Sequence, residues 1–82
     1  MNVIINIFPK KDVLNPEAEA VKKSLSNLGF DNIEKLSLGK QITMKINEKN
    51  KKIVQKLAYD MCEKLLVNSV IEDYKITILR EN

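Results

Sequence analysis

Apolar and polar residues alternate near both ends of the chain. Residues 2–8 are rich in β-branched side chains, which favours a largely buried strand. Pro9 is expected to end this strand, because proline cannot donate to the hydrogen-bond ladder. Residues 74–79 alternate in the same way and predict a C-terminal strand. The first and the last element of the fold are therefore expected to be strands.

The middle of the chain holds a further alternating segment. Three apolar side chains within residues 41–47 share one face, as in an antiparallel strand with one face on the core and the other in solvent. Residues 32–38 predict a shorter or bent strand. Gly39 separates the two segments, so they form either two strands joined by a turn or one long bulged strand.

Two other segments have the period of amphipathic helices. The first covers residues 16–28; it follows Asn15, a preferred N-cap residue, and has Pro16 at its first position. The second covers residues 50–66, and its apolar stripe is broader than one contact with a sheet requires, which indicates burial on two sides. This stripe consists of Ile53, Val54, Leu57, Ala58, Met61, Cys62 and Leu65.

The order of these elements predicts the fold class. The order is β-α-β-(β)-α-β, where the strand in brackets depends on how residues 32–47 are divided. It fits an α+β, ferredoxin-like two-layer sandwich, in which two helices pack on one face of an antiparallel sheet. With 82 residues there is room for one core, so residues 1–82 are expected to form a single domain.

The composition points to association with other chains. Chains of this size usually need disulfides, a metal or a partner for stability. Cys62 is the single cysteine and there is no histidine, so neither an internal disulfide nor a zinc site is expected. Oligomerisation or very regular packing of the core remains, and of these we expect oligomerisation, at least to a dimer.

The residues needed for common catalytic chemistry are missing from the sequence. Without histidine there is no Ser-His-Asp or Cys-His arrangement, and two glycines cannot build a phosphate-cradling loop. Cys62 lies in the apolar stripe and is interpreted as a small buried hydrophobic residue, not a nucleophile. We therefore expect no catalytic, cofactor-binding or metal-binding residue in this chain.

Charge and hydropathy exclude several binding roles. The net charge of +3 arises from interspersed basic and acidic residues, and only 5% of residues are aromatic, which argues against a base-stacking nucleic-acid surface. No apolar run approaches the roughly 20 residues of a membrane span. The N-terminus does not resemble a signal peptide, so a cytoplasmic location is expected.

Three segments resemble the small (S) subunit family of phosphoribosylformylglycinamidine synthase. They are residues 11–17, reading KDVLNPE, residues 38–40, reading LGK before an alternating strand, and residues 61–76, reading MCEKLLVNSVIEDYKI. The third is the most specific and follows a C-E-K-L-L-x-N-P-x-I-E-x-Y pattern. Ser69 stands where this pattern has proline. The resemblance extends over almost the whole chain.

The resemblance implies a role in purine biosynthesis. It implies assembly with a large ATP-dependent synthetase subunit and a glutaminase subunit, which together convert formylglycinamide ribonucleotide into formylglycinamidine ribonucleotide. The small subunit would be a homodimerising bridge without catalytic residues. ATP and Mg would be used by the complex and not bound by this chain.

The loop-to-helix entry at residues 11–16 and the segment of residues 68–74 are the main candidate contact surfaces, because recognition residues are commonly held in loops on a rigid scaffold. Gly39 and Lys40 are further candidates. Capping explains Asn15 and Pro16 in part, whereas several charged residues have no such explanation. A small-molecule-binding regulatory domain and a small nucleic-acid-binding module remain alternative functions. The candidate contact residues are Lys11, Asp12, Asn15, Pro16, Gly39, Lys40, Asn68, Val70, Ile71, Glu72, Asp73 and Tyr74.

Overall fold

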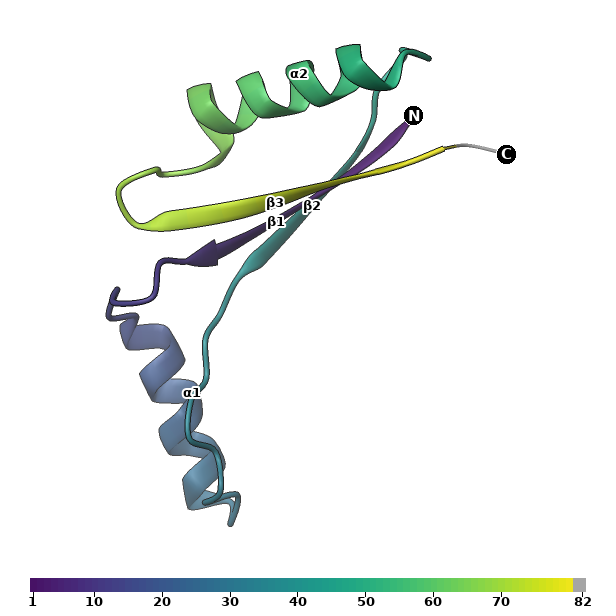
Figure 1. Cartoon of the computed structure of the whole chain (residues 1–82). Helices are drawn as coiled ribbons and strands as arrows, with labels where there is room; N and C mark the ends of the chain where they lie inside the picture. The colour runs from purple at the N-terminus through teal and green to yellow at the C-terminus, as the bar shows by residue number, and fades with distance from the viewer. Residues whose placement is uncertain (81–82) are drawn as a thin grey trace.

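The computed structural model describes residues 1–80 and has the predicted α+β element order (Figure 1). The expected domain of residues 1–82 thus ends two residues beyond the described part. Each predicted strand that forms begins and ends within two residues of its expected bounds, and so does the first helix. The elements are β1 (Asn2–Pro9), α1 (Pro16–Asn27), β2 (Lys40–Lys45), α2 (Lys51–Met61), the π-helical turn η1 (Cys62–Leu66) and β3 (Glu72–Leu79).

The sheet is antiparallel, with the order β2-β1-β3. Ile5 of β1 lies opposite Ile42 on one side and Ile76 on the other, so one apolar row crosses all three strands. Val3 forms a second row, with Met44 and Ile78. The apolar rows cover one face of the sheet, as the alternation in the sequence predicts.

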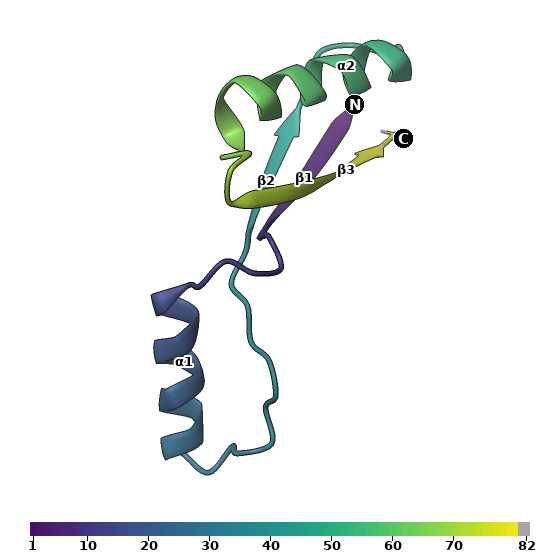
Figure 2. The same cartoon turned by 60° about the vertical axis from the view of Figure 1, so that its left-hand side comes forward.

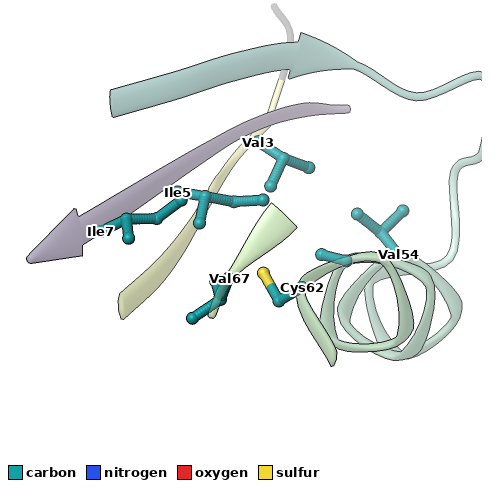
Figure 3. Packing of buried hydrophobic residues seen from close by; sticks show 7 residues of the cluster. Val3, Ile5, Ile7, Val54, Cys62 and Val67 are labelled. Atoms are coloured by element: carbon teal, nitrogen blue, oxygen red, sulfur yellow. The ribbon is translucent and has the colours of Figure 1, made fainter. Parts of the chain in front are cut away.

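Helix α2 covers the apolar face and completes the core (Figure 3). Val3, Ile5 and Ile7 of β1 are almost fully buried against Val54, Ala58 and Cys62, and Val67 closes the end of the cluster. Burial raises the pKa of the Cys62 thiol, which disfavours the reactive thiolate. The interpretation of Cys62 as a buried apolar residue is therefore confirmed.

Helix α1 begins and ends as the sequence predicts. The side chain of Asn15 accepts hydrogen bonds from the backbone N–H groups of Glu17 and Ala18, at 3.0 and 3.3 Å. Gly29 follows the last turn with a φ of +101°, a conformation that glycine adopts without steric cost.

The position of α1 differs from the expected sandwich. Only α2 packs on the sheet, whereas α1 lies beyond the end of the sheet at which β1 ends and β2 begins (Figures 1 and 2). We refer to residues 10–39 as the arm. It consists of α1 and an extended segment, residues 31–39, that returns beside the helix.

The predicted strand at residues 32–38 is not formed in this chain, and that prediction is wrong. The segment runs beside α1, where the side-chain Nζ of Lys22 donates to the carbonyl oxygen of Glu34 at 2.9 Å. A strand needs a neighbouring strand for its backbone groups, and the arm provides a helix instead. Of the two segments on either side of Gly39, only the second is a strand.

Candidate partner interface

A cleft at the root of the arm brings together half of the candidate contact residues. Its volume is about 500 Å³, and it is lined by the end of β1, the first turn of α1, residues 38–40 and residues 71–72. Figure 2 shows how the arm leaves the sheet at this point. The candidates that line it are Asn15, Pro16, Gly39, Lys40, Ile71 and Glu72.

Glu72 links two of the segments that line the cleft. Its Oε1 accepts a hydrogen bond from the backbone N–H of Asn68 at 2.8 Å, and its Oε2 lies 3.6 Å from Nζ of Lys40. The Glu72 side chain is only 19% exposed, compared with 59% for Lys40. Glu72 therefore has a structural role within the chain, which the sequence analysis did not attribute to it.

Asn68 closes the turn before β3. Its carbonyl oxygen accepts from the N–H groups of Ile71 and Glu72, at 3.1 and 2.8 Å, and its side-chain oxygen accepts from Val70 at 3.2 Å. The turn is thus closed by hydrogen bonds. It contains Ser69, which stands where the C-E-K-L-L-x-N-P-x-I-E-x-Y pattern has proline. Val70 is 79% exposed at the tip of this turn.

Lys10 connects the arm to the start of β3. Its backbone N–H donates to the carbonyl oxygen of Ile71 at 2.9 Å, and its Nζ lies 3.2 Å from Oδ1 of Asp73. Both side chains of the ion pair are about half exposed, so its contribution to stability is small. Sequence analysis missed Lys10, because its position depends on the pairing of β1 with β3.

The remaining candidates lie around the cleft and not in it. Lys11 and Asp12 form an exposed turn directly after β1. Tyr74 faces the helical layer, where its hydroxyl donates to Oε2 of Glu63 at 3.1 Å. Within residues 1–80, the structure contains no group of three or more His, Cys, Asp or Glu residues able to hold a metal ion.

The environment of Tyr74 predicts a change in stability at alkaline pH. Burial, followed by the hydrogen bond to Glu63, raises the pKa of Tyr74 to about 12 from an ordinary value of 10.0. A pKa that is higher in the folded state favours the protonated phenol. The stabilisation is therefore complete below pH 10 and is lost as the pH rises towards 12.

We expect Glu63→Gln to lower the pKa of Tyr74, since the charge that opposes phenol ionisation is removed. Absorbance titration of the phenol in the near ultraviolet, with Tyr74→Phe as the reference that lacks this group, measures the shift. An unchanged titration curve in Glu63→Gln would show that burial alone sets the pKa.

One flank of α2 carries a second, exposed apolar surface. We call it the α2 stripe, and its residues recur every fourth position while Val54, Ala58 and Cys62 face the core. The broad stripe in the sequence predicted burial on two sides, and the structure covers one of them. The α2 stripe consists of Ile53, Leu57, Met61 and Leu65, which are 45%, 38%, 36% and 83% exposed.

The comparison with protein families decides what the chain is related to. The family described as "PurS: Phosphoribosylformylglycinamidine (FGAM) synthase" matches residues 2–80. The chain belongs to the PurS family. The resemblance seen in the sequence is thereby confirmed, and the PurS match includes all three strands that contribute residues to the cleft.

Individual PurS proteins match over most of their length. The chain is 40% identical over 76 residues to the PurS subunit of phosphoribosylformylglycinamidine synthase from Methanocaldococcus jannaschii, covering 93% of this chain and 89% of that protein. It is 36% identical over 76 residues to the corresponding subunit from Bacillus subtilis, with the same coverage of 93% and 89%.

Solved PurS structures share the fold, including the arm. The M. jannaschii PurS crystal structure, one of the subunits of formylglycinamide ribonucleotide amidotransferase in the purine biosynthetic pathway, matches with a TM-score of 0.86 at 37% identity, covering 99% of this chain and 98% of that one. A chain of PurLQS from Thermotoga maritima matches with a TM-score of 0.86 at 29% identity, covering 95% of each chain. The α+β class and the antiparallel sheet with two helices are therefore family features.

Proposed function

We propose that this chain is the small subunit of an FGAM synthase and acts in purine biosynthesis. In this role it joins the ATP-dependent synthetase subunit to the glutaminase subunit, so that ammonia released from glutamine is used to form formylglycinamidine ribonucleotide. The observation that carries the proposal is the match, over 95% of both chains, to a chain of the PurLQS structure.

The subunit contributes binding surface, and the reaction chemistry belongs to its partners. Its one thiol, Cys62, is buried in the core with a raised pKa, so it is held away from substrate. In the proposed complex, ATP and Mg are bound outside this chain. We place the complex in the cytoplasm; among residues 1–80, neither helix has the length and apolarity to cross a membrane.

The contact with the catalytic subunits is proposed to lie at the root of the arm. The turn at residues 11–12 and the turn at residues 68–71 flank the cleft and carry exposed side chains of both chemical types, charged and apolar. The hydrogen bonds of Asn68 and Lys10 hold both turns in place before a partner arrives. Preformed loops of this kind bind with a smaller loss of conformational entropy.

Charge reversal at the root of the arm is expected to weaken assembly without unfolding the chain. Lys11→Glu changes an exposed turn, and Asp73→Lys replaces the ion pair with Lys10 by a pair of like charges. Because these side chains are exposed and solvent screens their charges, each variant should change the free energy of unfolding by only about 0.5 kcal/mol. Co-purification with tagged synthetase and glutaminase subunits measures assembly.

Lys51→Glu is the matched control for these variants, since it changes an exposed charge on α2, at the end of the helix far from the arm. It should co-purify with the partners as the unchanged chain does. Normal recovery of both root variants would move the interface elsewhere on the chain. Failure of the unchanged chain to co-purify with either partner would overturn the proposed function itself.

A further inference from the structure

The turn of residues 68–71 presents apolar side chains beside the root of the arm. It joins η1 to β3, and β3 begins next to the end of β1, where the arm departs (Figure 1). Val70 and Ile71 of this turn are 79% and 42% exposed. In the proposed complex a catalytic subunit covers this surface. The order of the turn in the free chain therefore affects how tightly the subunit binds.

A reciprocal pair of hydrogen bonds joins the two ends of the turn. The backbone N–H of Asn68 donates to Oε1 of Glu72 at 2.8 Å, and the backbone N–H of Glu72 donates to the carbonyl oxygen of Asn68, also at 2.8 Å. The acceptor of the first bond is a carboxylate, and charge-assisted bonds of this kind are roughly twice as strong as neutral ones. The Glu72 side chain thus closes the turn from its C-terminal end.

The bond to Asn68 is the stronger of the two contacts made by the Glu72 carboxylate. The Glu72 side chain is 19% exposed, and a carboxylate that is largely covered needs protein donors in place of water. Its second contact is the ion pair with Lys40, at 3.6 Å. The Lys40 side chain is 59% exposed, so solvent screens the ion pair and its contribution is small. The restraint that Glu72 supplies therefore acts mainly on the turn.

The backbone of the turn fits type I. The carbonyl oxygen of Asn68 accepts from the N–H of Ile71, three residues further on, at 3.1 Å. Among residues 1–80 only Gly29 has a positive φ, which excludes types I′, II and II′ for the turn. The side chain of Asn68 also accepts from the N–H of Val70, as asparagine commonly does at the first position of a turn.

Position 69 offers a second way of ordering the turn. It is the second residue of a type I turn, where proline is favoured because its ring fixes φ at about −65°. The N–H group of Ser69 takes no part in the hydrogen bonds of the turn, so proline at this position removes no donor. Ser69→Pro can therefore restrict the turn without help from the Glu72 carboxylate.

We propose that Glu72 is a positioning residue for assembly of the synthase. It orders the turn of residues 68–71 in the free chain, so that Val70 and Ile71 already have the arrangement in which a catalytic subunit binds them. The carboxylate acts through Asn68 and does not itself touch the partner. An ordered turn loses less conformational entropy on binding, which is the physical source of the effect. This inference rests on the proposed function, because the partner surface is the one proposed at the root of the arm.

Binding of the purified chain to a mixture of the synthetase and glutaminase subunits tests the proposal. In Glu72→Ala the turn loses its closing acceptor, so the Kd should rise roughly tenfold, since the turn must then be ordered on binding. Asp60→Asn is the matched control, because it removes a carboxylate that is paired with a lysine, Lys56, on α2. It should leave the Kd unchanged.

Rescue by proline separates a positioning role from direct contact. Addition of Ser69→Pro to Glu72→Ala should restore most of the lost affinity, because the proline ring restricts the turn in place of the carboxylate. If Ser69→Pro alone binds as the unchanged chain does but brings no recovery to Glu72→Ala, then Glu72 contacts the partner directly and the proposal is overturned.

Amide hydrogen exchange, measured by NMR on the chain alone, tests the ordering of the turn. In Glu72→Ala the N–H groups of Val70 and Ile71 should exchange about tenfold faster, while those of the central strand β1 keep their protection and show that the fold is retained. Unchanged exchange at both turn amides overturns the proposal, also where Ser69→Pro by itself weakens binding. If the unchanged chain binds neither subunit, the proposed function fails and this inference with it. Normal binding by the unchanged chain and by Glu72→Ala removes this inference alone.

Discussion

Omission of this chain from a reconstituted FGAM synthase is expected to abolish synthesis with glutamine as the nitrogen source. Synthesis with added ammonia should continue on the synthetase subunit. The physical reason is proximity: ammonia released by a separate glutaminase is diluted into solution, whereas a bridged complex keeps its local concentration high. The expected loss is therefore specific to the step that needs two active sites held together.

The measurement compares initial rates of formylglycinamidine ribonucleotide formation with each nitrogen source, with and without the chain. Adding the purified chain back should restore the glutamine-dependent rate, and the Lys51→Glu variant should restore it as well. Equal glutamine-dependent rates in the presence and absence of the chain would remove the bridging role. A parallel loss of the ammonia-dependent rate would mean instead that the chain is needed by the synthetase subunit itself.

Local features of the fold could be predicted from the sequence because local rules determine them. Asn15, Pro16 and Gly29 mark the ends of α1 through hydrogen-bonding and φ preferences that depend on a few neighbouring residues. The alternation in β1 and β2 identified the buried face, since neighbouring strand residues point to opposite sides. The wide stripe on α2 indicated more apolar surface than the chain's own sheet covers.

The position of α1 could not be predicted in the same way. An amphipathic stripe shows that a helix buries one face, but it does not identify what covers that face. The split β-α-β pattern assumes that both helices fold onto their own sheet. In this chain, contacts between residues distant in sequence, such as Lys10 with Ile71, set the direction of the arm. The same contacts leave residues 32–38 without a strand to pair with.

The candidate interface was predicted as separate segments and not as one site. Asn15, Gly39 and Glu72 meet at the cleft because β1 lies between β2 and β3, and strand order was not evident from the sequence. The role of Glu72 was also hidden, since its partners are a backbone group four residues away and a lysine on another strand. The sequence motifs indicated which segments to consider, but the topology was needed to separate structural from exposed residues.

Replacement of Gly39 by alanine is expected to cost more stability than replacement of Gly29, the other glycine of the chain, by asparagine. A Cβ atom at Gly39 would lie 2.6 Å from the carbonyl oxygen of Ile7. That oxygen belongs to the central strand, and the Ile7 side chain is 2% exposed in the core, so neither group can move freely. Overpacking of this kind costs about 1–3 kcal/mol. For a domain of this size, each kcal/mol lowers Tm by roughly 4–8 °C.

Gly29→Asn is the control, because it separates two causes of lost stability. At Gly39 a Cβ atom would collide with the backbone of Ile7, whereas at Gly29 only the positive φ disfavours a side chain. No atom lies within 4 Å of the position that a Cβ would take at Gly29, and its φ of +101° disfavours most side chains but disfavours asparagine less. The Tm of this variant should therefore fall less than that of Gly39→Ala. Both variants are measured at equal protomer concentration, because the Tm of a dimer depends on concentration. A Gly39→Ala protein as stable as the unchanged chain would show that the backbone at the root of the arm shifts easily to accommodate a Cβ atom.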